Sequence, residues 1–565
     1  MTEPAGPLFE IAPRDVISAP VRRWRPVHWL PVLQLLPAAV VIAAVLGAPF
    51  VATVVVSFAA GHGGLRNYGE VLADPNIRHA MGNSVRWVVF APLVCLAGLL
   101  AAWPGRRWYR SRWLVIALLA APAATSALVT GVAFRLLSGP GPGWIWLVLG
   151  LAFTWQWLGL AAVVFRAGLA GLPRDLLRVA RAFGAGRVRR GWSVALPALF
   201  PAGTLVLIIV LVAAARVFEL VLVTVPGGIQ DRVDVVGIHL WRFGQVLGDG
   251  ESAALSVLLS AFVAVVALAG LWGLSREWPA GQAPGTVPVS PGAVRRGPAR
   301  RLGGPAVGVL VGAVWLLPLI ALVLASLHEP AAAATGGWWS GGWGFGSYGA
   351  AFADGQLLPA LGSTLARVLI SCALLLVLAV PAAYGLACGG LPRAAVRALV
   401  AVLAVLAVLP PQAMAVPLGY GLDKLQLLGA AAPLIGVYVG IGLPLAILLL
   451  RGAFASVPLS LVRARQLDPV GGSALLAVVA RCWPALVAVA VLEFVLVWND
   501  LLVGLLFGGT EAGQATLVLF EQTREFATST GSLAAGAVLI TVVPLALVLA
   551  TGKWQVRGLT DGVRR

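Results

Sequence analysis

Charged residues inside long apolar runs are the first candidates for function in this sequence. Arg216 and Glu219 are three residues apart in one such run, and Glu493 lies in a later one. A charge at the middle of a bilayer costs about 2.5–3.5 kcal/mol, so such side chains face a protein interior or a partner. The spacing allows Arg216 and Glu219 to meet on one helix face. The pair is either a pathway or gate element or a buried ion pair that locks two helices.

Tryptophans and side-chain amides form a second group of candidates. They are Trp155, Gln156 and Trp157 in one run, and Trp498 and Asn499 in another. Sugar sites pair an aromatic ring, placed against the apolar face of the sugar, with amides or carboxylates that bind hydroxyl groups. The chain has 21 tryptophans, so most of them are expected at membrane interfaces or in packing rather than at a solute.

Residue patterns typical of enzymes and metal proteins are missing from the sequence. The four cysteines have no CxxC spacing and the five histidines are scattered, so neither a metal site nor a disulfide framework is predicted. The sequence contains no G-x-x-x-x-G-K-[ST] loop for ATP phosphates. We therefore expect no catalytic residue, no metal and no cofactor bound by this chain.

The composition explains where these residues must lie. Of 565 residues, 60% are hydrophobic and only 11% are charged, with a mean hydropathy of +0.93. In soluble proteins roughly a quarter of all residues are charged. A soluble enzyme, a disordered protein and a nucleic-acid binder are therefore excluded. A membrane helix needs about 20 mostly apolar residues. Twelve segments qualify: 30–58, 85–103, 113–137, 144–165, 202–225, 253–275, 303–327, 362–388, 395–420, 433–451, 485–507 and 531–552. Pro122, Pro381, Pro410 and Pro411 are expected to kink or split some of them.

The net charge is +18, and the distribution of the basic residues predicts how the chain is oriented in the membrane. With the N-terminus in the cytoplasm, 30 of the 40 basic residues fall in inward segments and only six in outward loops. This is the asymmetry of the positive-inside rule, and it has no bearing on nucleic acid. The N-terminal segment is too polar for a cleavable signal. The sequence therefore predicts an all-α, multi-pass protein of the bacterial plasma (inner) membrane with twelve transmembrane helices and both termini cytoplasmic.

The chain divides into two matching halves. A cytoplasmic N-terminal segment, 1–29, precedes a first six-helix domain, 30–275, and a second domain spans 303–565. A linker rich in Pro, Gly and Arg, 276–302, separates the two domains. The longest inward loops, 166–201 and 451–484, share five identities at an offset of 285 residues. This indicates duplication or fusion of two related units, as in other membrane transporters.

The first of these loops contains a short amphipathic pattern. Arg174, Arg178 and Arg181 follow i, i+4, i+7 spacing, and the apolar residues fall on the opposite side. The pattern predicts a cytoplasmic helix with a basic face. Such a helix either lies on anionic lipid headgroups or docks a soluble partner.

At these loops the sequence resembles the membrane subunits of bacterial ABC importers, which carry a cytoplasmic EAA loop. Arg178-Val179-Ala180 stand at the EAA positions, and Gly184, followed by Ala185, stands at the glycine. Leu196-Pro197 end the motif at the expected spacing. The glutamate of the motif is replaced by Arg178. The second copy departs further, since Arg463-Ala464-Arg465 replace EAA, although Asp468 matches an acidic position of the family.

Other segments resemble the carbohydrate importers of the maltose type. The most specific are Trp498-Asn499-Asp500, the Val-Phe-acidic stretch that ends in Glu219, and the Arg557-Gly558-Leu559 ending. The resemblance covers most of residues 30–565 and implies two type I permease halves fused in one chain. It implies two copies of a cytoplasmic ATPase, using ATP and Mg, on the EAA-type loops, and an extracytoplasmic binding protein that delivers the solute. In that family the solute path would be lined by the helices that carry Trp155, Gln156, Trp157, Arg216, Glu219, Trp498 and Asn499.

Three alternatives stay open at this point. The same machinery could carry ferric iron, thiamine or a phosphate ester instead of a sugar. A twelve-helix secondary transporter driven by a proton or sodium gradient has similar hydropathy. A membrane scaffold without transport is the third. Only a solute flux that requires ATP separates the first from the other two.

Overall fold

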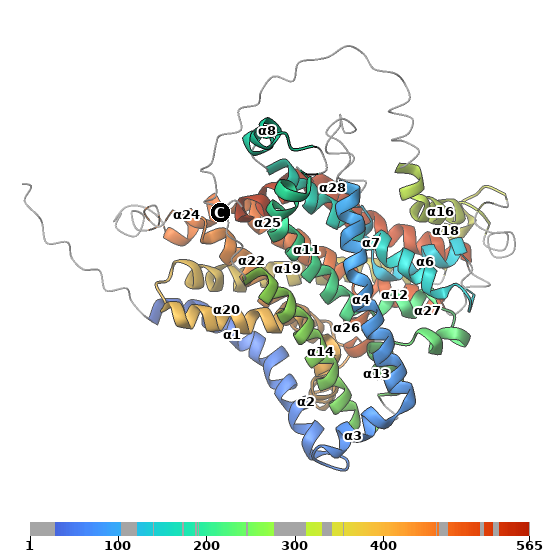
Figure 1. Ribbon diagram of the computed structural model, residues 1–565. Helices are drawn as coiled ribbons and strands as arrows, with labels where there is room; N and C mark the ends of the chain where they lie inside the picture. The colour runs from blue at the N-terminus through green and yellow to red at the C-terminus, as the bar shows by residue number, and fades with distance from the viewer. Residues whose placement is uncertain are drawn as a thin grey trace, which may run out of the picture.

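The helical architecture is seen in a computed structural model (Figure 1). It describes residues 29–102, 121–138, 141–171, 174–186, 189, 191–244, 247–275, 312–329, 339, 342–353, 355–458, 460, 462, 473–508, 513–523 and 530–563. Within these ranges the regular structure is helical, apart from one isolated bridge between His328 and Trp343. Residues 1–28 of the N-terminal segment, the whole linker 276–302 and Arg463 to Asp468 of the second loop lie outside the described residues.

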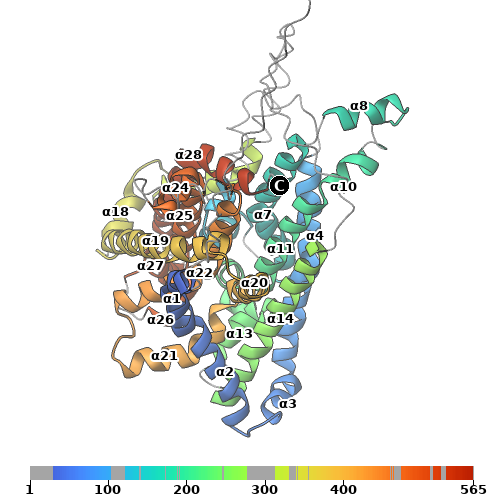
Figure 2. The same ribbon diagram turned by 90° about the vertical axis from the view of Figure 1, so that its left-hand side faces the viewer.

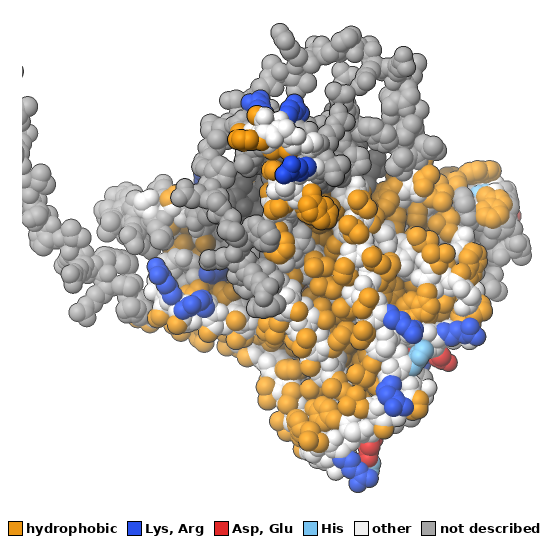
Figure 3. All heavy atoms as spheres, in the orientation of Figure 1, with side chains coloured by type: hydrophobic (Ala, Val, Ile, Leu, Met, Phe, Trp, Pro, Cys, Tyr) orange, Lys and Arg blue, Asp and Glu red, His pale blue; other side chains and the backbone are white. Residues whose placement is uncertain are grey.

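The helices have the length and composition of membrane spans. Among the described residues, seven are long and apolar enough to cross a bilayer, and ten if each of three bent pairs counts as one span. Figure 3 shows apolar side chains over most of the visible face, with basic side chains at its margins. The prediction of a polytopic, all-α membrane protein is therefore confirmed.

The first half begins with a long helix broken by one π turn. This helix consists of α1 (Trp29–Ile42), the π turn η1 (Ala43–Gly47) and α2 (Ala48–Ala59). The remaining helices, in chain order, are α3 (Arg66–Ala73), α4 (Pro75–Ala102), α6 (Ala127–Ser138), α7 (Ile145–Gly171), α8 (Arg174–Ala182), the π turn η2 (Gly191–Ala195), α10 (Leu196–Ala198), α11 (Phe200–Ala215), α12 (Glu219–Thr224), the 3-10 turn η3 (Gly227–Val233), α13 (Val236–Phe243) and α14 (Asp249–Ser275).

The prolines of the second half differ in their effect on the helices. Pro381 lies inside an unbroken helix, whereas at Pro410 and Pro411 the chain bends by 98°. The helices are α16 (Leu317–Ser326), α18 (Gly346–Ala353), α19 (Leu357–Cys388), α20 (Arg393–Val408), the 3-10 turn η4 (Pro411–Met414), α21 (Ala415–Lys424), α22 (Ala431–Phe454), α24 (Ala474–Arg481), α25 (Trp483–Trp498), α26 (Leu502–Phe507), α27 (Ala515–Gln522) and α28 (Thr530–Val563).

The fifth span repeats between the halves with its interruptions in place. In the first half it runs as 191–198, α11 and α12, and in the second as α24, α25 and α26. Every one of these six bounds recurs 283 residues later. This offset is two residues shorter than the 285 that the loop identities indicated. The helix bounds, which are set by backbone hydrogen bonding over whole elements, support the internal duplication more strongly than the five identities do.

The two halves exchange contacts through their first helices. In the first half, α1 packs against α19 and α22 of the second half, while its continuation α2 packs against α14 of its own half (Figure 2). In the second half, α16 packs against α28 of its own half and against α6 of the first half. Both first helices thus bridge the two halves, and the halves form one packed unit.

Gly440 on α22 lets η1 of the first half approach closely. A Cβ built there would lie 2.5–2.8 Å from the side-chain carbons of Val45, whereas nothing lies within 4 Å of a Cβ at Gly436. We expect Gly440→Ala to lower the free energy of unfolding by about 1–3 kcal/mol through overpacking. Gly436→Ala, one turn earlier, is expected to raise it by about 0.5–1 kcal/mol, since alanine favours helix. Thermal melts of the purified variants measure both, and equal shifts would contradict the close contact.

Candidate functional site

The basic helix of the first inward loop is present as predicted. Figures 1 and 2 show α8 standing away from the helix bundle at one end of the molecule. Arg178 and Val179 are exposed, and Phe183, just after the helix, is 86% exposed. A basic helix with an exposed aromatic residue at its end, held off the bundle, is a surface suited to a partner protein as well as to lipid.

The end of α8 explains why a glycine follows it. Gly184 has a φ of +75°, in the left-handed region that side chains with a Cβ avoid. The N–H of Gly184 donates to the carbonyl of Arg181 at 3.0 Å, and the N–H of Ala185 donates to Ala180, also at 3.0 Å. These bonds close the helix and turn the chain sharply. Val179, Ala180, Gly184 and Ala185 are therefore held on one rigid turn, but Arg463, Ala464 and Asp468 of the second loop lie outside the described residues.

The predicted pairing of Arg216 with Glu219 is wrong. Helix α11 ends at Ala215, and the backbone at Arg216 and Phe218 is not helical, so the two side chains do not share a helix face. No ion pair joins them among the described residues. Three-residue spacing brings side chains together only within a continuous helix, and the break removes that condition. Sequence hydropathy could not show it, because the run stays apolar across the break.

Glu219 instead binds the second half of the chain. Its Oε1 accepts hydrogen bonds from the backbone N–H groups of Leu501, at 3.1 Å, and Leu502, at 3.3 Å. These N–H groups open α26, and the first N–H groups of a helix have no partner within the helix. A carboxylate there also complements the positive end of the helix dipole. Glu219 is thus a cap supplied by one half to a helix of the other.

Asp500 caps the same helix from within the second half. Its Oδ2 accepts from the N–H groups of Val503, at 2.9 Å, and Gly504, at 3.3 Å, and from the Tyr438 hydroxyl at 3.0 Å. Gln514 donates both to that hydroxyl, at 3.0 Å, and to the Asp500 carbonyl, at 2.7 Å. Asp500 is also the acidic group that acts electrostatically on Arg216. Two carboxylates, one from each half, therefore converge on the start of α26.

Asn499 makes the return contact to the first half. Its Nδ2 donates to the carbonyl of Ala124 at 2.9 Å, while its Oδ1 is buried without a hydrogen-bond partner among the described residues. The structure thus brings Glu219, Asn499 and Asp500 to one place, which we call the cross-half junction, together with Arg216. Sequence reasoning missed Tyr438 and Gln514. The lone tyrosine in the apolar run 433–451 was the available signal for the first of them.

The predicted aromatic platforms are packed inside the protein. Trp155 is 5% exposed, and its Nε1 donates to the carbonyl of Trp315 at 2.6 Å. Trp498 is 2% exposed, stacks on Phe494 at 5.6 Å and donates to the carbonyl of Ile540 at 2.9 Å. Neither indole offers a free ring face in this conformation. Their contact with a solute stays a prediction, as does that of the half-buried Gln156 and Trp157 beside them.

Glu493 is likewise buried, at 5% exposure, on α25. A Cβ built at Gly442 of α22 would come within 2.5 Å of both its carboxylate oxygens. The glycine therefore makes the room that this carboxyl group occupies between two helices of the same half.

Comparison with known proteins agrees with this architecture. Residues 94–274 match the family described as binding-protein-dependent transport system inner membrane component. The osmoprotective compounds uptake permease protein GgtD of Synechocystis is 30% identical over 267 residues, covering 44% of this chain and 87% of that protein. The trehalose transport system permease protein SugB of Mycobacterium tuberculosis is 30% identical over 224 residues, covering 39% of this chain and 81% of its own length. The chain belongs to the ABC importer permeases.

The family match places the first-half features in context. It runs from within α4 to the end of α14, and so includes α8 and the broken fifth span. Each relative covers less than half of this permease but most of its own length, as expected when two permease units are fused. A solved structure of a bacterial ABC transporter that imports alginate is 19% identical, with a TM-score of 0.39, over 44% of this permease and 96% of that chain. This structural similarity is too low to support the family assignment, which rests on the family match and the relatives. The permease is a transport component, not an enzyme.

Proposed function

We propose that this permease carries a sugar or sugar-like solute through the bacterial inner membrane by alternating access. The choice of a sugar rests on the similarity of this permease to two sugar permeases. One is the trehalose permease, and the other is the alpha-glucoside transport system permease protein AglG of Rhizobium meliloti, which is 34% identical over 198 residues. In this proposal an extracytoplasmic binding protein delivers the solute. Two copies of a cytoplasmic ATPase, which bind ATP and Mg, supply the energy.

Twelve spans with both termini in the cytoplasm fit this function. The proposed total of twelve counts the two shorter apolar helices α6 and α16 as crossings, in addition to the seven long helices and the three bent pairs of the described residues. An even number returns the chain to its starting side. The excess of Arg in the predicted inward segments then puts α8 in the cytoplasm, where an ATPase can reach it.

The cross-half junction is the element that alternating access must rearrange. Glu219 and Asn499 hydrogen-bond across the two halves, so moving the halves apart breaks contacts whose groups then need new partners or water. ATPase subunits that close on ATP would draw α8 and the second loop together. We propose that this closure is passed to the cross-half junction through the rigid turn at Gly184.

A phosphate ester is the second candidate solute. The sn-glycerol-3-phosphate transport system permease protein UgpA of Brucella abortus is 28% identical over 222 residues, or 76% of that protein. A phosphate dianion needs cationic groups along its path, and Arg216 is a half-buried cation that interacts electrostatically with Asp500 of the cross-half junction. A neutral sugar has no such requirement.

Uptake into proteoliposomes separates the two candidates. The permease is reconstituted with its ATPase and binding protein, and ATP-dependent accumulation of labelled trehalose, an alpha-glucoside and sn-glycerol 3-phosphate is compared. We expect accumulation of an alpha-glucoside sugar and no accumulation of the phosphate ester. We also expect Arg216→Gln to leave the sugar preference unchanged. Accumulation of the phosphate ester alone, with a selective loss in Arg216→Gln, would overturn the sugar assignment.

A further inference from the structure

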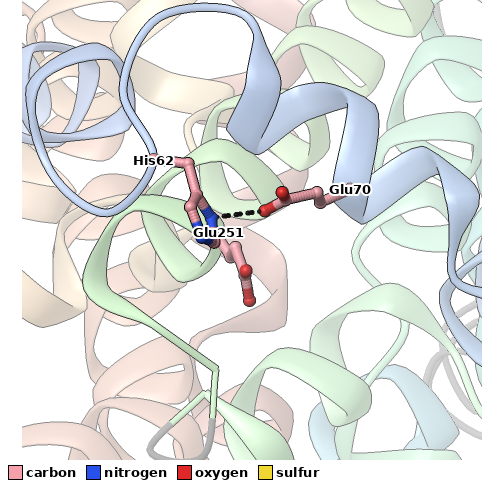
Figure 4. Close-up of side chains that lie close together, drawn as sticks. All are labelled: His62, Glu70 and Glu251. Atoms are coloured by element: carbon pink, nitrogen blue, oxygen red, sulfur yellow. Dashed lines mark hydrogen bonds and ion pairs between the residues drawn. The ribbon is translucent and has the colours of Figure 1, made fainter.

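One cluster of metal-ligating side chains lies outside the cross-half junction, at the end of the molecule opposite α8 (Figure 1). It consists of His62, in the turn between α2 and α3, Glu70 on α3 and Glu251 in the first turn of α14 (Figure 4). One ligand atom of each residue lies within 4.8 Å of the corresponding atom of the other two. His62 Nδ1 is 2.8 Å from Glu70 Oε2. Glu251 is 181 residues beyond Glu70 in the sequence, and for that reason the sequence spacing gave no metal signal.

The backbone beneath the cluster is tightly fixed. The Asn67 side chain is fully buried and donates to the carbonyls of Ser57, at 2.9 Å, and Ala60, at 2.8 Å. Its Oδ1 accepts the backbone N–H of His62 at 3.3 Å. A Cβ at Gly250 would lie 2.5 Å from the Ala60 carbonyl oxygen. The turn and the start of α14 are thus in direct contact, so the three side chains are presented from a rigid base.

The charges of the cluster leave one carboxylate without a partner. Glu70 pairs with His62 and with Arg66, whose Nε lies 3.0 Å from Glu70 Oε1. Glu251 has no hydrogen bond or ion pair among the described residues, although it lies beside Glu70 and His62. Arg66 is 70% exposed, and an exposed i,i+4 pair is worth only about 0.3–0.5 kcal/mol. Arg66 can therefore give way to a cation bound between the two carboxylates.

We infer that His62, Glu70 and Glu251 form a binding site for a divalent transition metal ion such as Zn²⁺. One imidazole nitrogen and two carboxylate oxygens are ligands that Zn²⁺ accepts, and water completes a tetrahedral set. With metal–ligand bonds of about 2.1 Å, the donor atoms must approach to roughly 3.4 Å. The present separations, within 4.8 Å, must shorten to this value by side-chain rotation. The nitrogen ligand distinguishes the site from one for Mg²⁺ or Ca²⁺, which favour oxygen ligands. The ion would link the turn after the first span to the start of α14.

Zinc binding to the full-length permease tests this inference without any transport assay. The protein is stripped with EDTA in lipid nanodiscs, and ZnCl₂, MgCl₂ and CaCl₂ are titrated separately by calorimetry and by thermal melting. We expect one Zn²⁺ per chain and a rise in melting temperature of a few degrees, because a ligand that binds only the folded state stabilises it. His62→Ala and Glu251→Gln are each expected to weaken Zn²⁺ binding at least tenfold.

Two matched variants serve as controls. His79→Ala removes a histidine whose ring contacts the Arg232 carbonyl instead of the cluster, and it should leave Zn²⁺ binding unchanged. Arg66→Ala removes the competing cation and should leave Zn²⁺ binding intact or strengthen it. The inference is overturned if no stoichiometric Zn²⁺ binding occurs, or if binding survives both His62→Ala and Glu251→Gln. Equal binding of Mg²⁺ that survives His62→Ala would also overturn it.

Discussion

The double variant Gly184→Asp Ala185→Asp is expected to lose its ATPase and to stop importing solute, while still inserting into the membrane. Both residues lie on the exposed turn that ends α8. An unpaired charge buried in an interface costs about 3 kcal/mol or more, which corresponds to at least a 100-fold loss of affinity. Co-purification of the ATPase with the tagged permease, and the level of the permease in the membrane fraction, measure the two effects.

The neutral variant Gly184→Asn Ala185→Asn is the matched control for shape and backbone. Asparagine has the size of aspartate and tolerates the left-handed conformation at Gly184 about as well. The double asparagine variant is expected to retain much of its association with the ATPase. Ala73→Asp, on an exposed position of α3, controls for a new surface charge elsewhere. If the ATPase still co-purifies with the double aspartate variant, α8 is not its docking element.

Glu219→Ala is expected to lower the free energy of unfolding by about 2–4 kcal/mol and to abolish uptake. The substitution removes the acceptor for two backbone N–H groups, those of Leu501 and Leu502. Each buried donor left without a partner costs about 1–3 kcal/mol, and the bilayer interior offers no water to replace the carboxylate. Thermal melting of the purified permease reports the stability, and uptake of the labelled solute reports transport.

Glu219→Gln tests whether the hydrogen bonds or the charge matter. Its amide oxygen can accept from the same two N–H groups, so we expect a loss of stability within about 1 kcal/mol of wild type. Glu521→Ala changes an exposed glutamate on α27 and should leave the melting temperature unaltered. Equal destabilisation by Glu219→Ala and Glu219→Gln would show that the charge, rather than the cap, holds the two halves together.

Helix breaks and proline effects were only partly predictable from the sequence. Pro410 and Pro411 bend the chain as predicted, but Pro381 lies in an unbroken helix. The break at Arg216–Phe218 has no proline and no polar run to mark it. It forms where Glu219 is drawn to the N–H groups of α26. A contact between residues 282 positions apart thus accompanies a local change in backbone that local sequence does not indicate.

The membrane class, the basic helix at 174–182 and the duplication followed from the sequence alone, since hydropathy, charge asymmetry and helical spacing are properties of neighbouring residues. The family resemblance also lay in local motifs, and the comparisons confirmed it. Only the tertiary structure decided that Glu219 caps a helix of the second half, and that Trp155 and Trp498 are packed inside the protein. It also decided that His62 lies beside Glu251. These outcomes depend on side chains brought together from distant parts of the chain, and the order of residues along one helix carries no information about its packing partner.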